Sequence, residues 1–196
     1  MAKPSLREKI LDAGLQVMFR HGYNGTSVRD VCAAANAPQG SFTNHFRSKE
    51  AFALEVLDRY FAYVQTLVAD ALDDPKRTPR QRLKRYLDVI SGKLAADEFV
   101  RGCLIGDLSL EAAPHSETLR RRLLHIFAEW RAPFAACIAE AQAAGEIDDT
   151  FAADELAEFL LASWHGAILR MKVERSAAPL QRFKRIAFAT VFKETT

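Results

Sequence analysis

The sequence predicts an all-α protein of about nine helices, and three observations lead to that prediction. Apolar residues recur every three or four positions through nearly the whole chain, as on one face of a helix. No segment shows the sustained apolar–polar alternation of a half-buried strand. The stretches between the periodic segments contain the serines, glycines and prolines that begin and end helices.

The first helix is predicted to begin after Ser5 and to end near Gly22. Ser5 and Glu8 have the spacing of a capping box, in which each side chain binds a free backbone amide of the first turn. Glycine commonly follows the last helical turn. One face of this helix carries Leu6, Ile10, Ala13, Val17 and Met18.

Two short helices joined by a tight turn are predicted next. Ser27 and Asp30 form a second capping box, so a helix should begin at Ser27. Asn36 tolerates the positive φ that the turn requires, and Pro38 suits the first position of the following helix. The predicted buried face of the first short helix consists of Val28, Val31, Cys32 and Ala35.

The helix after Pro38 carries many polar side chains around only two large apolar ones, Phe42 and Phe46. Gln and Asn match the donor and acceptor pair of adenine, and glycine permits close backbone approach, so the pattern suits a DNA-reading helix-turn-helix. A plain polar surface helix explains the spacing equally well. The residues predicted to meet base edges are Gln39, Gly40, Thr43 and Asn44, and those predicted to meet phosphate are Thr26, Ser27, Ser41, His45 and Lys49.

Three segments closely resemble the DNA-binding domain of TetR-family transcriptional regulators: Ser27–Val31, Gly40–Phe42 and His45–Phe52. Thr43 departs from the tyrosine usual in that family. The resemblance implies a helix-turn-helix DNA-binding domain over residues 1–49 and a helical ligand-binding and dimerisation domain over residues 50–196. It also implies three partners, namely double-stranded DNA with a palindromic operator, a small-molecule inducer and a second copy of the chain.

Six further helices are predicted beyond the helix-turn-helix. Pro75 forces a stop, Pro133 removes one backbone hydrogen bond inside a long helix and should kink it, and Gly145 ends that helix. The predicted ranges are 48–73, 79–96, 103–111, 116–144, 151–175 and 179–193. In the TetR family the last two helices form the dimer interface, so helices 8 and 9 are expected to pair with a second copy. An intramolecular core is the alternative for their wide apolar surface, which comprises Leu156, Phe159, Leu160, Trp164, Ala167, Ile168, Met171, Leu180, Phe183, Ile186, Ala187 and Val191.

Charge and composition agree with this organisation. The first 50 residues hold seven Lys and Arg against four Asp and Glu, net +3, while the rest carries net −1, so the N-terminal end should face DNA. We find neither a signal-peptide core nor an apolar run of about 18 residues, and we expect a cytoplasmic protein without a membrane partner. The three cysteines are odd in number and widely spaced, which predicts free thiols. No metal, cofactor or catalytic residue is predicted.

The segment Arg101–Glu111 is the candidate effector site. It resembles a TetR branch that answers reactive, electron-poor molecules and carries Gly-Cys-Leu at the start of its sixth helix, where Cys103 stands. A helix N-terminus and Arg101 would stabilise a reactive thiolate, and Lys172 would add a second positive charge where helix 8 lies against helix 6. A small buried hydrophobic residue is the alternative for this cysteine. Phe99, Phe127 and Trp130 are candidate pocket residues, with plain core as their alternative.

Two other classes of function stay open at the level of sequence. One is a thiol-dependent enzyme that pairs Cys103 with His115 or His125, although no motif fixes such a pair. The other is an architectural DNA-binding protein without a ligand. Gel-shift experiments with and without candidate inducers separate these classes from an inducible regulator.

Overall fold

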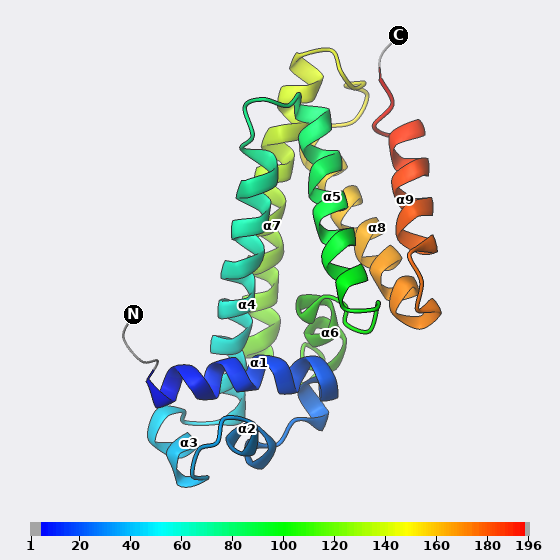
Figure 1. Cartoon of the computed structure of the whole chain (residues 1–196). Coiled ribbons are helices and arrows are strands. Elements are labelled where there is room, and N and C mark those ends of the chain that lie inside the picture. The colour runs from blue at the N-terminus through cyan, green and yellow to red at the C-terminus, as the bar shows by residue number, and fades with distance from the viewer. Residues whose placement is uncertain (1–4, 195–196) are drawn as a thin grey trace. The chain divides into compact units, whose positions relative to one another are not determined.

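The computed structural model describes residues 5–194, and over that range it holds nine α-helices and no strand (Figure 1). The helices are α1 Leu6–Gly25, α2 Val28–Ala34, α3 Gly40–His45, α4 Lys49–Leu72, α5 Pro79–Ala96, α6 Leu104–Glu111, α7 Glu117–Ala143, α8 Ala153–Glu174 and α9 Ala178–Ala189. The predicted all-α fold is confirmed. None of these helices is long and apolar enough to cross a membrane.

The chain packs as two compact units. The first comprises Met1–Tyr63 and Cys103–His125, and the second comprises Val64–Gly102 and Ile126–Thr196. Helix α6 therefore belongs to the same unit as α1, α2 and α3, while α4 and α7 contribute residues to both units. This division follows packing and differs from the predicted functional domains 1–49 and 50–196, which stay a prediction.

An aromatic cluster forms the core beneath the short helices of the first unit. Phe42, Phe46 and Phe52 are each at most 3% exposed, and their ring centroids lie 4.8 to 5.2 Å apart. Gly14 of α1 makes room for this cluster, because a Cβ atom there would overlap the Phe52 ring. The cluster fixes α3 on α1 and α4, since edge-to-face aromatic packing is directional as well as apolar.

The predicted caps of the helix-turn-helix are confirmed. The Ser27 hydroxyl accepts from the Asp30 amide at 3.1 Å, the Asp30 carboxylate accepts from the Ser27 amide at 3.2 Å, and Asn36 adopts a φ of 51°. Val31 and Cys32 of α2 are buried, whereas two other predicted core residues, Val28 and the C-cap residue Ala35, are only half-buried.

The predicted end of regular helix near Gly22 is confirmed: α1 runs to Gly25, but Gly22 interrupts it with a non-helical φ of 70° and ψ of −179°. The predicted start of the third helix was wrong. Helix α3 begins at Gly40 rather than Pro38, because the Pro38 carbonyl closes only a preceding turn by accepting from the Ser41 amide at 2.9 Å. Glycine accommodates the backbone at position 22, and a side chain there would be strained.

The second unit has its own core, which includes the edge-to-face pair Tyr86 and Phe134, with ring centroids 4.8 Å apart. Helix α7 continues through Pro133. Helix α9 ends at Ala189, four residues before its predicted end. Thr190 leaves the helical region, and the following turn brings the buried Phe192 back, so that its amide donates to the Ala187 carbonyl at 2.8 Å.

Candidate DNA interface and effector site

Helix α3 presents an exposed polar face on a buried aromatic base. Phe42 and Phe46 point into the core of the first unit at 2% and 3% exposure. The hydroxyl of Thr43 donates to the Gly40 carbonyl at 3.0 Å. All four residues predicted to meet base edges are exposed, and so is His45: Gln39, Gly40, Thr43, Asn44 and His45. Five polar or small residues on a rigidly anchored turn of helix match what direct base readout in the major groove requires.

The residues predicted to meet phosphate divide into exposed and internal groups. Ser27 is exposed, and its hydroxyl donates to the Asp30 carboxylate at 2.5 Å, which lowers the pKa of Asp30. Ser41 is half-buried. Thr26 is only 3% exposed, and its hydroxyl donates to the Gly22 carbonyl at 2.6 Å. The Thr26 side chain therefore fixes the turn between α1 and α2 from inside.

Lys49 begins α4 and lies against the end of α1. Its ammonium donates to the Asn24 carbonyl at 3.4 Å and sits 4.6 Å from the centre of the Tyr23 ring. Burial lowers the pKa of Lys49, and the nearby carboxylate of Glu111 opposes that shift. The side chain is thus half-buried and already engaged within the first unit.

Cys103 does not have the stabilised thiolate that the sequence suggested. Burial raises the pKa of its thiol, and this outweighs the backbone amides of Gly106 and Ile105, which favour the charged sulfur. Arg101, expected to add positive charge, is paired with Asp97 at 3.2 Å. The thiol is therefore protonated at neutral pH, and the Tyr60 hydroxyl lies 3.9 Å from its sulfur.

All three cysteines, Cys32, Cys103 and Cys137, are free thiols, as the sequence predicted, and all three are buried. Burial raises the pKa of Cys137 to about 11, and its sulfur donates to the Pro79 carbonyl at 3.3 Å. Over residues 5–194, His, Cys, Asp and Glu form no group of three or more that could hold a metal ion.

Two of the candidate effector residues gather at the loop before α6. A Cβ atom built on Gly102 would lie 3.9 Å from the Lys172 ammonium and 3.6 Å from Ile168. The carbonyl of Phe99 accepts from the Arg175 guanidinium at 3.4 Å, and Phe99 itself has a φ of 59°. The C-terminal end of α8 thus contacts the loop that leads to Cys103.

The other two candidates, Phe127 and Trp130, share a neighbour that was not among the predicted site residues, His165. The ring of His165 lies 5.1 Å from Trp130 and 6.0 Å from Phe127, centroid to centroid. Burial lowers the pKa of His165 to about 4, and its buried Nε2 atom has no hydrogen-bond partner among the described residues. The aromatic spacing gave no signal for this histidine, because it comes from a different helix, α8.

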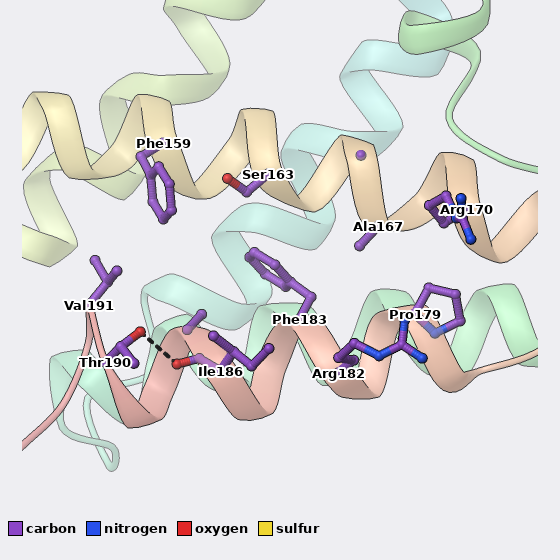
Figure 2. Close-up of a pocket in the computed structure, with 12 residues that line it drawn as sticks. Phe159, Ser163, Ala167, Arg170, Pro179, Arg182, Phe183, Ile186, Thr190 and Val191 are labelled. Carbon is purple, nitrogen blue, oxygen red and sulfur yellow. Dashed lines mark hydrogen bonds between the residues drawn. The ribbon is translucent and has the colours of Figure 1, made fainter.

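A groove of about 350 Å³ runs between α8 and α9 within the second unit (Figure 2). Phe159 and Ile186 face it at 48% and 51% exposure, with Ser163, Gly166 and Phe183 also in its lining. Most of the predicted apolar surface is instead buried within the chain. Its buried members include Leu156, Leu160, Trp164, Ile168, Met171 and Leu180. The intramolecular alternative is therefore correct for these six residues.

The chain matches two family models that together span most of its length. Residues 10–56 match the bacterial regulatory proteins of the tetR family, and residues 79–187 match the C-terminal domain of tetracyclin-repressor-like proteins. The chain belongs to the TetR family. In this TetR-family protein, the first match contains α2 and α3, the two helices of the predicted DNA-reading motif.

Relatives of this TetR-family protein align over nearly its whole length. It is 43% identical to the HTH-type transcriptional repressor DhaR of Mycobacterium sp. strain GP1, over 100% of this chain and 96% of that one. A crystal structure of regulatory protein TetR from Rhodobacter sphaeroides has 34% identity and a TM-score of 0.88, covering 93% of this chain and 97% of that one.

The repressor NemR of Escherichia coli K12 is 30% identical over 89% of this chain and 88% of its own. A structure of NemR from E. coli, in its reduced form, has a TM-score of 0.83 at 25% identity, covering 97% of this chain and 99% of that one. Together the family match and these full-length similarities identify the chain as a DNA-binding transcriptional regulator with a helix-turn-helix.

Proposed function

We propose that this protein is a repressor that binds a palindromic operator as a homodimer and leaves it when a small molecule binds. The observation that carries the proposal is the exposed polar face of α3 on its buried Phe42 and Phe46 base. The similar proteins DhaR and NemR are both named transcriptional repressors, which supports repression as the mode of action.

In this proposal four residues in or next to α3 read sequence, while other residues of α3 and residues at the starts of α2 and α4 hold the DNA backbone. Gln39, Gly40, Thr43 and Asn44 meet base edges. Ser27, Ser41, His45 and Lys49 meet phosphate, which positions the protein without selecting sequence. Thr26, with its hydroxyl turned inward, supports the turn that presents Ser27.

Dimerisation is proposed through the groove between α8 and α9. Its exposed apolar members, Phe159 and Ile186, are costly to leave in water, and a second copy of the same two helices would cover them. A two-fold dimer presents two α3 helices to successive major grooves, about 34 to 36 Å apart on B-DNA, which matches a palindrome.

The proposed effector is an electrophile or oxidant that reacts at Cys103, with Lys172, Phe99, Phe127 and Trp130 as further effector contacts. An electron-poor alkene forms a carbon–sulfur bond, its double bond opens, and the thiol proton ends on the adjacent carbon. Because burial keeps the Cys103 thiol protonated, this reaction should be slow without local opening and faster at higher pH. A structure of the similar protein NemR is described as its reduced form, which is consistent with a regulator that responds to oxidation.

The test measures release of the protein from DNA by an electrophile. Cys103→Ser preserves size and should bind the upstream DNA of the protein's own gene normally, yet stay bound at an N-ethylmaleimide dose that releases wild type. Cys137→Ser is the matched control, because Cys137 is also a buried thiol, and this variant should be released like wild type. If the Cys103→Ser variant were released at the same dose as wild type, the effector would have to act at another cysteine or in a non-covalent pocket.

A further inference from the structure

Glu111, the last residue of α6, reaches the turn that precedes the DNA-binding helices. Its carboxylate accepts from the Asn24 backbone amide at 3.0 Å, and its carbonyl lies 3.5 Å from the Asn24 side-chain nitrogen. Both residues belong to the first compact unit. One side chain of α6 thus satisfies a backbone donor in the last turn of α1, 87 residues away in sequence.

Gly22 leaves room for this contact beside the turn. A Cβ atom at Gly22 would overlap the Glu111 carboxylate, and the local φ of 70° strains any residue with a side chain. The Gly22 carbonyl in turn accepts the Thr26 hydroxyl at 2.6 Å. Two hydrogen bonds therefore connect Glu111 to Thr26 through the backbone of residues 22–24. Thr26 lies directly before Ser27 and α2.

Lys49, the first residue of α4, contacts the same turn. Its ammonium donates to the Asn24 carbonyl at 3.4 Å and lies over the Tyr23 ring, so Asn24 is held by Glu111 through its amide and by Lys49 through its carbonyl. The carboxylate of Glu111 also favours the charged form of Lys49. The turn is thereby fixed between α6 and the start of α4.

We propose that Glu111 is a positioning residue for DNA binding, which fixes the turn at residues 22–26 and thereby sets the start of α2. The inference rests on the proposed operator binding and deepens it. Glu111 itself touches no DNA in this account. Loss of the Glu111 carboxylate would leave the Asn24 amide without this acceptor, loosen the turn at residues 22–26 and move Ser27 away from the DNA backbone, without any change in α3.

The direction in which Glu111→Ala changes operator affinity separates a positioning role of Glu111 from a simple effect of its negative charge. Removing a carboxylate from a DNA-binding unit weakens repulsion of phosphate, so electrostatics alone predicts equal or tighter binding by Glu111→Ala. Positioning predicts the reverse, an operator affinity about tenfold weaker, because backbone contacts around Ser27 are lost. Glu111→Gln keeps an oxygen that accepts the Asn24 amide and should retain most of the affinity.

The experiment measures fluorescence anisotropy of labelled upstream DNA at several salt concentrations, with circular dichroism and thermal unfolding of each variant. Glu117→Ala is the control, because Glu117 belongs to the same unit and pairs with Arg120 and Arg121 instead. The expected result is weaker binding by Glu111→Ala alone, with a salt slope unchanged because the lost contacts are uncharged. A salt slope lowered by about 0.9 would instead indicate a lost Lys49–phosphate contact and overturn the proposed route.

Wild-type affinity for Glu111→Ala, or equal losses in Glu111→Ala and Glu111→Gln, would overturn the inference and leave operator binding intact. If Glu111→Ala fails to fold, Glu111→Asp decides the matter. Aspartate keeps the charge but is one methylene too short to reach the Asn24 amide, so positioning predicts weaker binding and charge alone predicts wild-type affinity. Failure of the wild-type protein to prefer its upstream DNA over a scrambled duplex would instead contradict the proposed function itself.

Discussion

Individual residues divide into those whose role follows from type and spacing and those whose role depends on burial. Ser27, Asp30 and Asn36 act through local backbone geometry, and the sequence predicted them correctly. Cys103 and Thr26 depend on what covers them. A helix N-terminus suggested a thiolate at Cys103, but burial determines its charge, and burial is a tertiary property that spacing along one helix does not reveal.

Asn44→Ala tests base readout at the scale of one side chain. Asn44 is exposed on α3, where its amide suits adenine, so we expect a loss of about 1 to 3 kcal/mol on the specific site and little on random DNA. Fluorescence anisotropy, with unlabelled specific and random duplexes as competitors, measures both affinities. Gln65→Ala on α4 is a matched exposed control. An unchanged preference for the specific duplex would remove Asn44 from base readout.

His165 should make the second unit sensitive to acid. The unfolded chain binds a proton at this residue near pH 6.5, while the folded protein does so only near pH 4. Because the unfolded chain takes up this proton first, the free energy of unfolding falls as the pH drops from 6.5 to 4, by about 3 kcal/mol in total. Above pH 6.5 His165 is neutral in both states and causes no such loss.

His165→Gln carries no titrating group, so its free energy of unfolding should fall less than that of wild type between pH 7.5 and pH 4.5. Urea denaturation at both pH values measures the difference. The exposed His125→Gln should lose stability as wild type does. Parallel losses in the His165 variant and wild type would show that this histidine is not held neutral.

At the scale of elements, the sequence predicted the number and order of the helices better than their ends. Proline and glycine placed the stops between helices, yet α9 ends four residues early. Its last turn is replaced by a return of Phe192 into the core and by Arg80, whose guanidinium donates to the Phe192 carbonyl at 2.7 Å. A contact between residues 112 positions apart leaves no local trace in a sequence.

The exposed residues of the groove between α8 and α9 are better positions for a test of dimerisation than the buried residues of the same apolar surface. Ile168 is only 6% exposed in the single chain, so a charge there would unfold the protein, whereas Ile186 is 51% exposed. Ile186→Glu should place a charge in the proposed interface, lower the dimer fraction and leave the helical content of the monomer unchanged.

Sedimentation at micromolar concentration measures that outcome for Ile186→Glu. Leu124→Glu adds the same charge at a site on α7 that is 58% exposed, and it should sediment as wild type does. A persistent Ile186→Glu dimer would place the interface elsewhere on the chain.

At the scale of the whole molecule, family membership and the geometry of α3 answer different questions. The family models establish a DNA-binding regulator, and the sequence motifs anticipated it because the helix-turn-helix is local and its caps are short-range. The effector site was less predictable. Its candidate residues fall into separate groups, one at the loop around Gly102 and one around His165, and only the tertiary structure reveals that grouping.

The central claim is that two copies of the chain read one palindrome with paired α3 helices. Footprinting locates the site upstream of the protein's own gene, and anisotropy then compares that duplex with one carrying five extra base pairs between its half-sites. Five base pairs turn one half-site by about half a helical turn, so the account predicts binding at least about tenfold weaker to the lengthened duplex. Equal affinity for the two duplexes, or for an isolated half-site, would contradict it.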